Sequence, residues 1–169
     1  MQVTIREAKP SDAKQLIAYV QRLAKEPDID IPLAPGEFNL TVEEEKQILA
    51  DRMASDNSIM LVAEVGGQIV GQLGCKGGKR KATRHAVTLG MSVHGGWRNQ
   101  GIGSALMAQA IKWAKNTGVV TRIELNVFAR NEMAIHLYEK FGFQVEGRRC
   151  RAVYHDGEYL DDYIMALLL

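Results

Sequence analysis

The chain has 169 residues, of which 46% are apolar, so we expect a single domain over residues 1–169 with a substantial core. Its 21 lysines and arginines nearly balance its 20 aspartates and glutamates, so bulk charge gives no reason to expect a nucleic-acid or anionic-membrane partner. No apolar run approaches the roughly 20 residues that span a bilayer, and charges from Arg6 onward interrupt the amino terminus before a signal sequence could develop, so we expect a cytoplasmic protein.

Hydrophobic periodicity and turn residues predict the first elements of the chain. A strand over residues 2–8 precedes a helix that begins at Pro10-Ser11-Asp12, and a second helix over 41–53 begins with a Thr-x-x-Glu capping box. The loop between these helices, residues 27–40, is long for a compact domain. Loops of this length are often functional, so we expect this one to contribute to a binding site.

Three strands are predicted next, over residues 58–65, 68–75 and 84–93, and Gly66-Gly67 is typical of a hairpin turn between the first two. The remaining elements are two helices and three strands. In chain order they are a helix over 101–116, a strand over 123–128, a helix over 131–141, and strands over 143–149 and 159–168. This order predicts an α+β domain with one mixed sheet of about seven strands and about four helices on its faces.

A glycine-rich loop after the fourth predicted strand, from Val93 to Leu106, is the most informative segment. A strand ends there and an amphipathic helix begins. The first N–H groups of a helix have no internal partner and lie at the positive end of its dipole, and glycines let an anion approach them closely. We therefore expect this loop to bind an anion of the size of a pyrophosphate.

Three kinds of phosphate loop compete for this segment. A Walker A loop ends in Gly-Lys-Ser/Thr, which is missing, and a dinucleotide fingerprint needs a third glycine where Leu106 stands. The third pattern is Arg98-x-x-Gly101-x-Gly103. It resembles the pyrophosphate loop of the GNAT acetyltransferases, whose usual form is Arg or Gln, two residues, Gly, one residue, then Gly or Ala. From this motif alone, the loop could also be a turn that begins a helix and binds no phosphate.

A second motif, from Asn131 to Phe143, resembles the same family. It matches the GNAT pattern Asn-x-x-Ala-x-x-Leu-Tyr-x-Lys-x-Gly-Phe at each stated position, and one strand separates it from the first motif, as in the family. The predicted order of elements agrees with the GNAT fold over nearly the whole chain. One departure is Gly95, where many members have proline. The resemblance implies a three-layer fold whose mostly antiparallel sheet is splayed between its fourth and fifth strands.

The resemblance also implies a cofactor, acetyl-CoA, with coenzyme A as the product. Backbone groups near Met91 and Val93 are expected to pair with its pantetheine arm, and Asn131 is expected to contact the arm from the other side. The pyrophosphate is expected at backbone N–H groups of the glycine-rich loop, namely those of Arg98, Asn99, Gln100, Gly101, Ile102, Gly103 and Ser104.

Acetyl transfer to an amine requires loss of a proton from an ammonium whose pKa is about 10.4, and a proton for the leaving thiolate. Tyr138 is the candidate acid, because a phenol stays protonated at pH 7. Periodicity alone makes Tyr138 a core aromatic, and the motif favours the acid role.

Glu124 is the candidate base. An equal alternative is that it lies on a solvated strand face, and strand alternation places it on the same face as Asn126. The N–H near Val93 is a candidate oxyanion donor.

The acceptor pocket is expected from the loop before the second helix and from the last hairpin. Candidates that bind the acceptor are Glu37 and Phe38 in the loop, Asn126 on the fifth strand and Tyr159 in the hairpin. The histidines and cysteines show no metal-ligand spacing, so no metal is expected.

The tail from Asp156 to Met165 looks like that of members that acetylate small amines such as amino acids or polyamines. The resemblance therefore implies an N-acetyltransferase that transfers acetyl directly to the primary amine of a small molecule. Two alternatives stay open, namely a protein or peptide acceptor and a non-catalytic module that binds acyl-CoA. Many members of the family dimerise through an exposed strand after the splay, so the resemblance also raises a homodimer.

Overall fold

The computed structural model describes residues 2–27 and 29–169 and contains one seven-stranded sheet in the order β1-β2-β3-β4-β5-β7-β6. The strands are β1 (Thr4–Glu7), β2 (Ile59–Val65), β3 (Gln68–Gly77), β4 (Ala86–Val93), β5 (Arg122–Phe128), β6 (Gln144–His155) and β7 (Glu158–Leu168). The helices are α1 (Ala13–Leu23), α2 (Val42–Met53), α3 (Ile102–Asn116) and α4 (Glu132–Lys140), with short 3-10 turns η1 (Pro10–Asp12) and η2 (Gly95–Trp97).

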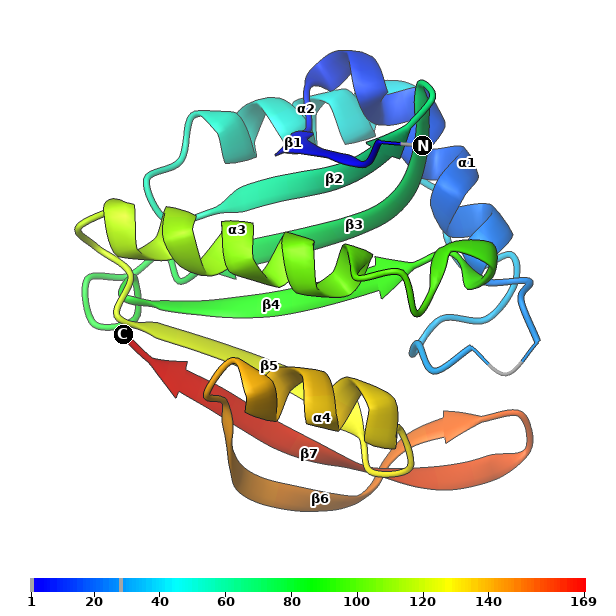
Figure 1. Cartoon of the computed structure of the whole chain (residues 1–169), viewed down its shortest axis with the longest axis vertical. Helices are drawn as coiled ribbons and strands as arrows, with labels where there is room; N and C mark the ends of the chain where they lie inside the picture. Colours follow the sequence, from blue (N-terminus) through cyan, green and yellow to red (C-terminus); the bar gives the residue numbers. More distant parts are fainter. Residues whose placement is uncertain (1, 28) are drawn as a thin grey trace.

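The helices lie on both faces of the sheet, with α3 and α4 on one face and α1 and α2 on the other (Figure 1). Every pair of neighbouring strands is antiparallel except β4 and β5, which are parallel. The predicted α+β class, with a mixed, mostly antiparallel sheet between helical layers, is confirmed. None of the helices in the described residues combines the length and apolar character that a bilayer span needs.

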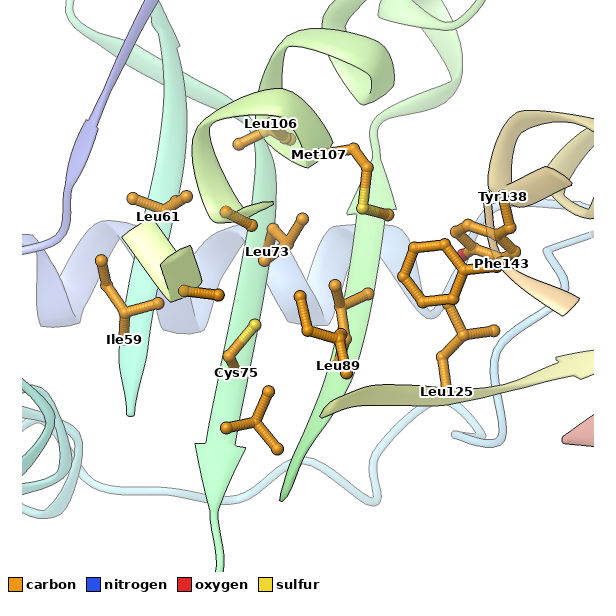
Figure 2. Close-up of a cluster of buried hydrophobic side chains, with 14 of the residues drawn as sticks. Ile59, Leu61, Leu73, Cys75, Leu89, Leu106, Met107, Leu125, Tyr138 and Phe143 are labelled. Carbon is orange, nitrogen blue, oxygen red and sulfur yellow. The ribbon is translucent and has the colours of Figure 1, made fainter. Parts of the chain in front are cut away.

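Two apolar clusters hold the layers together. Figure 2 shows the larger one, in which Leu61 and Leu73 lie beneath Leu106 and Met107 of α3. The adjacent residue Val62 belongs to the smaller cluster, which packs under α1 and α2. Successive side chains of a strand point to opposite faces, so β2 is buried on both of its faces and fixes the positions of both helical layers.

Local signals in the sequence account for the boundaries of several elements. The Thr41 hydroxyl accepts the N–H of Glu44 at 3.2 Å, and the Glu44 carboxylate accepts the N–H of Thr41 at 2.8 Å. This reciprocal capping box begins α2 where the sequence predicts it. Between β2 and β3, Gly66 and Gly67 have φ of 55° and 81°, the left-handed pair that a two-residue hairpin turn requires.

The parallel pairing of β4 and β5 is short. It covers Ala86–Thr88 against Arg122–Glu124, although β4 continues to Val93 and β5 to Phe128. Beyond this point β4 stays paired with β3 and β5 stays paired with β7, so the two strands diverge without losing their outer neighbours. Figure 1 shows this divergence between β4 and β5. The predicted splay is confirmed, and the inner edges of both strands carry backbone groups without a partner strand.

One predicted element is much longer in the structure. The sequence predicts a strand over 143–149, whereas β6 continues to His155. The turn at Asp156 and Gly157 has φ of 48° and 84°, so pairing with β7 continues up to the turn. Register shifts between Val145 and Gly147 and again after Arg149 absorb extra residues in β6. Such bulges interrupt the alternation from which a strand is recognised.

Replacing Leu106 with alanine tests the larger cluster. The Leu106 side chain is 0% exposed, so its loss should lower the free energy of unfolding by about 2–5 kcal/mol. Chemical denaturation measures this value. The control is Leu168→Ala, because Leu168 is 72% exposed and its replacement should change stability by less than about 0.5 kcal/mol. Equal effects of the two substitutions would contradict the assigned core.

Candidate active site

A cavity of about 980 Å³ passes through the sheet where β4 and β5 diverge. On one face, its walls come from the start of α3 and from α4. On the other face, they come from the loop residues 29–33 and from Arg52 of α2. The ends of β4 and β5 form its sides. The divergence therefore creates an opening that joins the two faces of the sheet.

Most of the predicted site residues line this cavity. They come from β4, the glycine-rich loop, the start of α3, the end of β5 and α4, and are Met91, Val93, Arg98, Asn99, Gly101, Ile102, Gly103, Ser104, Asn126, Asn131 and Tyr138. The two sequence motifs, which are separated by a strand in the chain, thus meet across one cavity.

Glu124, the predicted base, does not line the cavity. It shares a face of β5 with Asn126, but it pairs with Thr88 at the last position where β4 and β5 are still joined. Its carboxylate accepts hydrogen bonds from Arg122 at 3.1 and 3.0 Å, and Arg122 also binds Glu146. The carboxylate is therefore held in a surface ion-pair network beside the closed part of the sheet.

Four other predicted residues also lie outside the cavity lining. Gln100 donates its amide to the carbonyl of Gly96 at 3.1 Å. Glu37 accepts the N–H of Ala34 at 2.8 Å, and Phe38 packs against the smaller apolar cluster.

The last of the four, Tyr159, is 63% exposed and lines a separate shallow pocket with Arg148 and Tyr163. The loop before α2 does line the cavity as expected, but through residues 29–33. The last hairpin lines it through Arg149, Val153 and Asp162.

The glycine-rich loop presents a run of free N–H groups. Within the described part of the chain, no acceptor is found for the N–H groups of residues 99–104. Asn99 and Gly101 are left-handed, with φ of 60° and 79°, and such residues in a turn direct successive N–H groups into one concave site for an anion. A side chain at Gly103 would approach Leu137 to 3.3 Å, so glycine there lets α3 begin close to α4. The loop fits a pyrophosphate.

Arg98 braces this loop from within the protein. Its Nε donates to the carbonyl of Val93 at 2.9 Å, and its Nη2 donates to the carboxylate of Glu26, three residues after the end of α1, at 2.5 Å. Glu26 also accepts the N–H of Gly95 at 2.9 Å. A proline, common at the position of Gly95 in the family, has no N–H to donate. Gly95, which stands where many family members have proline, therefore offers an N–H that the Glu26 carboxylate uses to hold the loop.

Tyr138 lies on α4 at the wall of the cavity and is 7% exposed. Its ring packs against Phe143 with centroids 5.8 Å apart. Burial raises the pKa of Tyr138 to about 12. Asn131 begins the helix, because its side-chain oxygen accepts the N–H of Ala134 at 3.1 Å. The cap fixes the start of α4, so it also sets where the phenol meets the cavity, and the phenol stays protonated at neutral pH.

Sequence reasoning missed five charged residues of the lining, namely Asp30, Arg52, Lys76, Arg149 and Asp162. Asp162 is 2% exposed and forms an ion pair with Arg149, its partner across β6 and β7. A carboxylate inside the apolar run of the last strand is a signal that could have identified Asp162. Asp30 lies in the loop 27–40 that was expected to contribute to a binding site. The other three depend on contacts between distant segments, so the sequence gives no comparable signal for them.

Removing the brace tests the role of Arg98. Arg98→Met leaves the largely buried Glu26 carboxylate without its cation, so we expect the free energy of unfolding to fall by roughly 1–3 kcal/mol. Glu26→Gln in the same background should recover most of this loss, because no unpaired charge is left. Denaturation of the single and double variants measures the coupling. Unchanged stability of Arg98→Met would show that the brace contributes nothing to the fold.

Comparison with proteins of related sequence identifies acetyltransferases. Residues 29–143 match the model of the acetyltransferase (GNAT) family. The L-amino acid N-acetyltransferase AaaT of Escherichia coli (strain K12) is 39% identical over 117 residues, which are 69% of this chain and 72% of the relative. An N-alpha-acetyltransferase of Sulfurisphaera tokodaii is 29% identical over 164 residues, which are 92% of this chain and 96% of the relative.

Solved structures share the fold. A GNAT-family acetyltransferase from Streptococcus pneumoniae superposes with a TM-score of 0.95 at 37% identity, over 99% of both chains. The yncA protein of Salmonella typhimurium, solved with its cofactor acetyl-CoA, superposes with a TM-score of 0.86 over 100% of this chain and 95% of that one. At 20% identity, that likeness shows the fold alone. Together with the family match, these findings show that the chain belongs to the acetyltransferase (GNAT) family and is an acetyltransferase.

Proposed function

We propose that the protein transfers an acetyl group from acetyl-CoA directly to the primary amine of a small molecule, such as an amino acid or a polyamine. The cavity through the divergence of β4 and β5 carries this proposal, because it joins the anion-binding loop to Tyr138 and then to the opposite face of the sheet. The likeness to the L-amino acid N-acetyltransferase of E. coli supports a small amine as acceptor.

The residues of this chain fit acetyl-CoA along the cavity. When bound, the cofactor supplies an acetyl thioester that an amine can attack. The N–H groups of residues 99–104 bind its pyrophosphate, because they are free and lie at the start of α3. The unpaired edge of β4, which includes Met91 and Val93, offers backbone groups to the pantetheine arm in the manner of an added strand. Asn131 borders the arm from α4.

Tyr138 holds a proton at its hydroxyl for the departing sulfur. The raised pKa of its phenol keeps this proton in place at neutral pH. Burial alone causes this shift in pKa, and within residues 2–27 and 29–169 no carboxylate or cation competes for the hydroxyl. A neutral donor in a site of low dielectric gives up its proton only when negative charge develops beside it. We assign Tyr138 as the general acid.

The acceptor enters from the face opposite α3 and α4. On that side, Asn126 and the loop residues 29–33 line the cavity. The Asn126 amide can accept a hydrogen bond from the amine and orient it toward the divergence. Glu124, Glu37, Phe38 and Tyr159 lie outside this lining, so they take no part in the proposed site.

A peptide amino terminus is the second candidate acceptor. The N-alpha-acetyltransferase of Sulfurisphaera tokodaii, which matches 92% of this chain, favours it. A thiol-release assay with acetyl-CoA and a panel of amino acids, polyamines and short peptides separates the two. Faster release with small amines supports the proposal. Release with peptides alone would replace it, and binding of acetyl-CoA without release would indicate a non-catalytic module.

Replacing Tyr138 with phenylalanine should lower kcat by about 10²-fold or more, because the departing sulfur loses its proton donor. The KM for acetyl-CoA and the free energy of unfolding should change little, since the hydroxyl that is removed has no hydrogen-bond partner among the described residues. Steady-state thiol release and denaturation measure these quantities. A variant with unchanged kcat would remove Tyr138 from the mechanism.

The pKa of Tyr138 also determines how kcat/KM depends on pH in the alkaline range. Because the phenol titrates at about 12, its acid form persists through the alkaline range in which the acceptor amine loses its proton, near pH 10. We therefore expect kcat/KM to rise with pH up to about pH 9, in the wild type and in Tyr138→Phe alike. A wild-type rate that declines above pH 8, without a matching decline in Tyr138→Phe, would contradict this assignment.

A further inference from the structure

Two positively charged side chains line the cavity on the side where the acceptor enters. Arg52 projects from α2, and Lys76 lies near the end of β3. Over residues 2–27 and 29–169, no carboxylate lies within 4.0 Å of either of them. The fold has thus placed two unneutralised cations beside one opening.

The other charges of the lining are already paired. Arg149 binds Asp162, Arg98 binds Glu26, and Asp30 binds Arg130 at 3.0 Å. Each of these ion pairs therefore presents almost no net charge to a ligand. The cavity on the acceptor side therefore has an excess of positive charge, and this excess comes from Arg52 and Lys76.

The guanidinium of Arg52 is held in place on the sheet. Its Nη1 donates to the carbonyl of Ile59 at 3.1 Å. A Cβ at Gly74 would lie 2.7 Å from Nη1, so the arginine rests directly on bare backbone. Burial lowers the pKa of Arg52, and Glu45 on the same helix acts in the opposite direction without reaching ion-pair distance. A half-buried cation of this kind is stabilised when an anion binds beside it.

The floor beside Arg52 has room for a ligand. Gly74 pairs with Gly90 across β3 and β4, both line the cavity, and a Cβ at Gly90 would meet nothing within 4 Å. The next pair on the same face is Lys76 with Thr88. The two cations thus flank a glycine floor. The wall above it is apolar, formed by Leu23, Ile29, Ile31, Leu33 and Met60.

We propose that Arg52 and Lys76 form a carboxylate subsite of the acceptor pocket, so that the acceptor is an amine with a carboxylate and an apolar body, such as an apolar α-amino acid. This inference rests on the acetyltransferase function proposed above and selects within it. Two neighbouring cations attract a carboxylate and repel a second ammonium group. Polyamines are therefore poor acceptors, and the apolar wall binds the side chain of the amino acid.

Matched pairs of acceptors test this subsite. Thiol release is measured with L-leucine, L-methionine and L-phenylalanine and with the amide of each, which keeps the side chain but lacks the carboxylate. Rates are compared per concentration of neutral amine, because loss of the carboxylate also lowers the pKa of the neighbouring ammonium. We expect kcat/KM to be at least about tenfold higher for the acids, because the amides make no charge-assisted contact. Amides that react as well as the acids would overturn the proposal.

Single substitutions test which side chains cause the preference for the acids. Lys76 is exposed, so Lys76→Met should fold normally, raise the KM for the acids by about tenfold and leave the amides unaffected. Lys79→Met is the matched control, because Lys79 is an exposed lysine of the β3–β4 turn outside the cavity. Arg52→Gln should act like Lys76→Met, with thermal unfolding as a check on folding. If Lys76→Met weakens acids and amides equally, the carboxylate subsite is wrong.

The outcomes also separate this inference from the function on which it rests. Release with polyamines or peptides but with none of the amino acids would overturn the subsite and leave an acetyltransferase. Release with no amine at all would overturn the proposed function, and the subsite with it.

Discussion

The active-site architecture depends on one feature of the sheet, which is that β4 and β5 pair over only three residue positions and then separate. A sheet normally satisfies the backbone groups of both strands at every position, and unpaired inner edges are costly unless something fills them. Here each strand keeps its outer neighbour, so the divergence does not unravel the sheet. The opening is thus a stable part of the fold, with two backbone edges available to a ligand.

The helices keep this opening in place. The start of α3 packs on β3 and β4, and Gly103 lets it approach α4 closely. The anion-binding N–H groups and the phenol of Tyr138 therefore meet at the same cavity. On the opposite face, Glu26 lies three residues after the end of α1 and holds the glycine-rich loop through Arg98 and Gly95. Both helical layers thus contribute to one site, although they pack on opposite faces of the sheet.

Charged side chains line the cavity on the proposed acceptor side, some in ion pairs and some not. Arg149 and Asp162 form an ion pair across β6 and β7. Arg52 and Lys76 also line the cavity, but no carboxylate of residues 2–27 and 29–169 lies within ion-pair distance of them, so we propose that their charge is available to a ligand. The anion-binding loop and these two cations lie on different sides of the sheet, and the divergence joins them. This arrangement fits the proposed reaction, in which acetyl-CoA and an acceptor with a carboxylate, both anionic, meet within the cavity.

The sequence allowed much of this to be predicted, because local signals specify local structure. The capping box at Thr41 and the glycine pair at Gly66 depend only on neighbouring residues. The face of Glu124 was also predictable from strand alternation. Its distance from the cavity was not, because alternation does not show at which residue β5 leaves β4.

Tertiary contacts were beyond the reach of such signals. Arg52 reaches the cavity only because α2 packs over the glycine at position 74. The pairing of Arg149 with Asp162 depends on register shifts in β6, which the sequence pattern does not reveal. Contacts of this kind join residues far apart in the chain, so they can be read only from the folded structure.

Amide hydrogen exchange with and without coenzyme A tests the central claim most directly. If the unpaired edge of β4 and the glycine-rich loop bind the cofactor, exchange should slow over residues 89–93 and 99–104, and stay unchanged in β1, an edge strand of the sheet outside the cavity lining. Binding of coenzyme A without added protection over residues 89–93 would contradict the account, because the divergence of β4 and β5 would then hold no part of the cofactor.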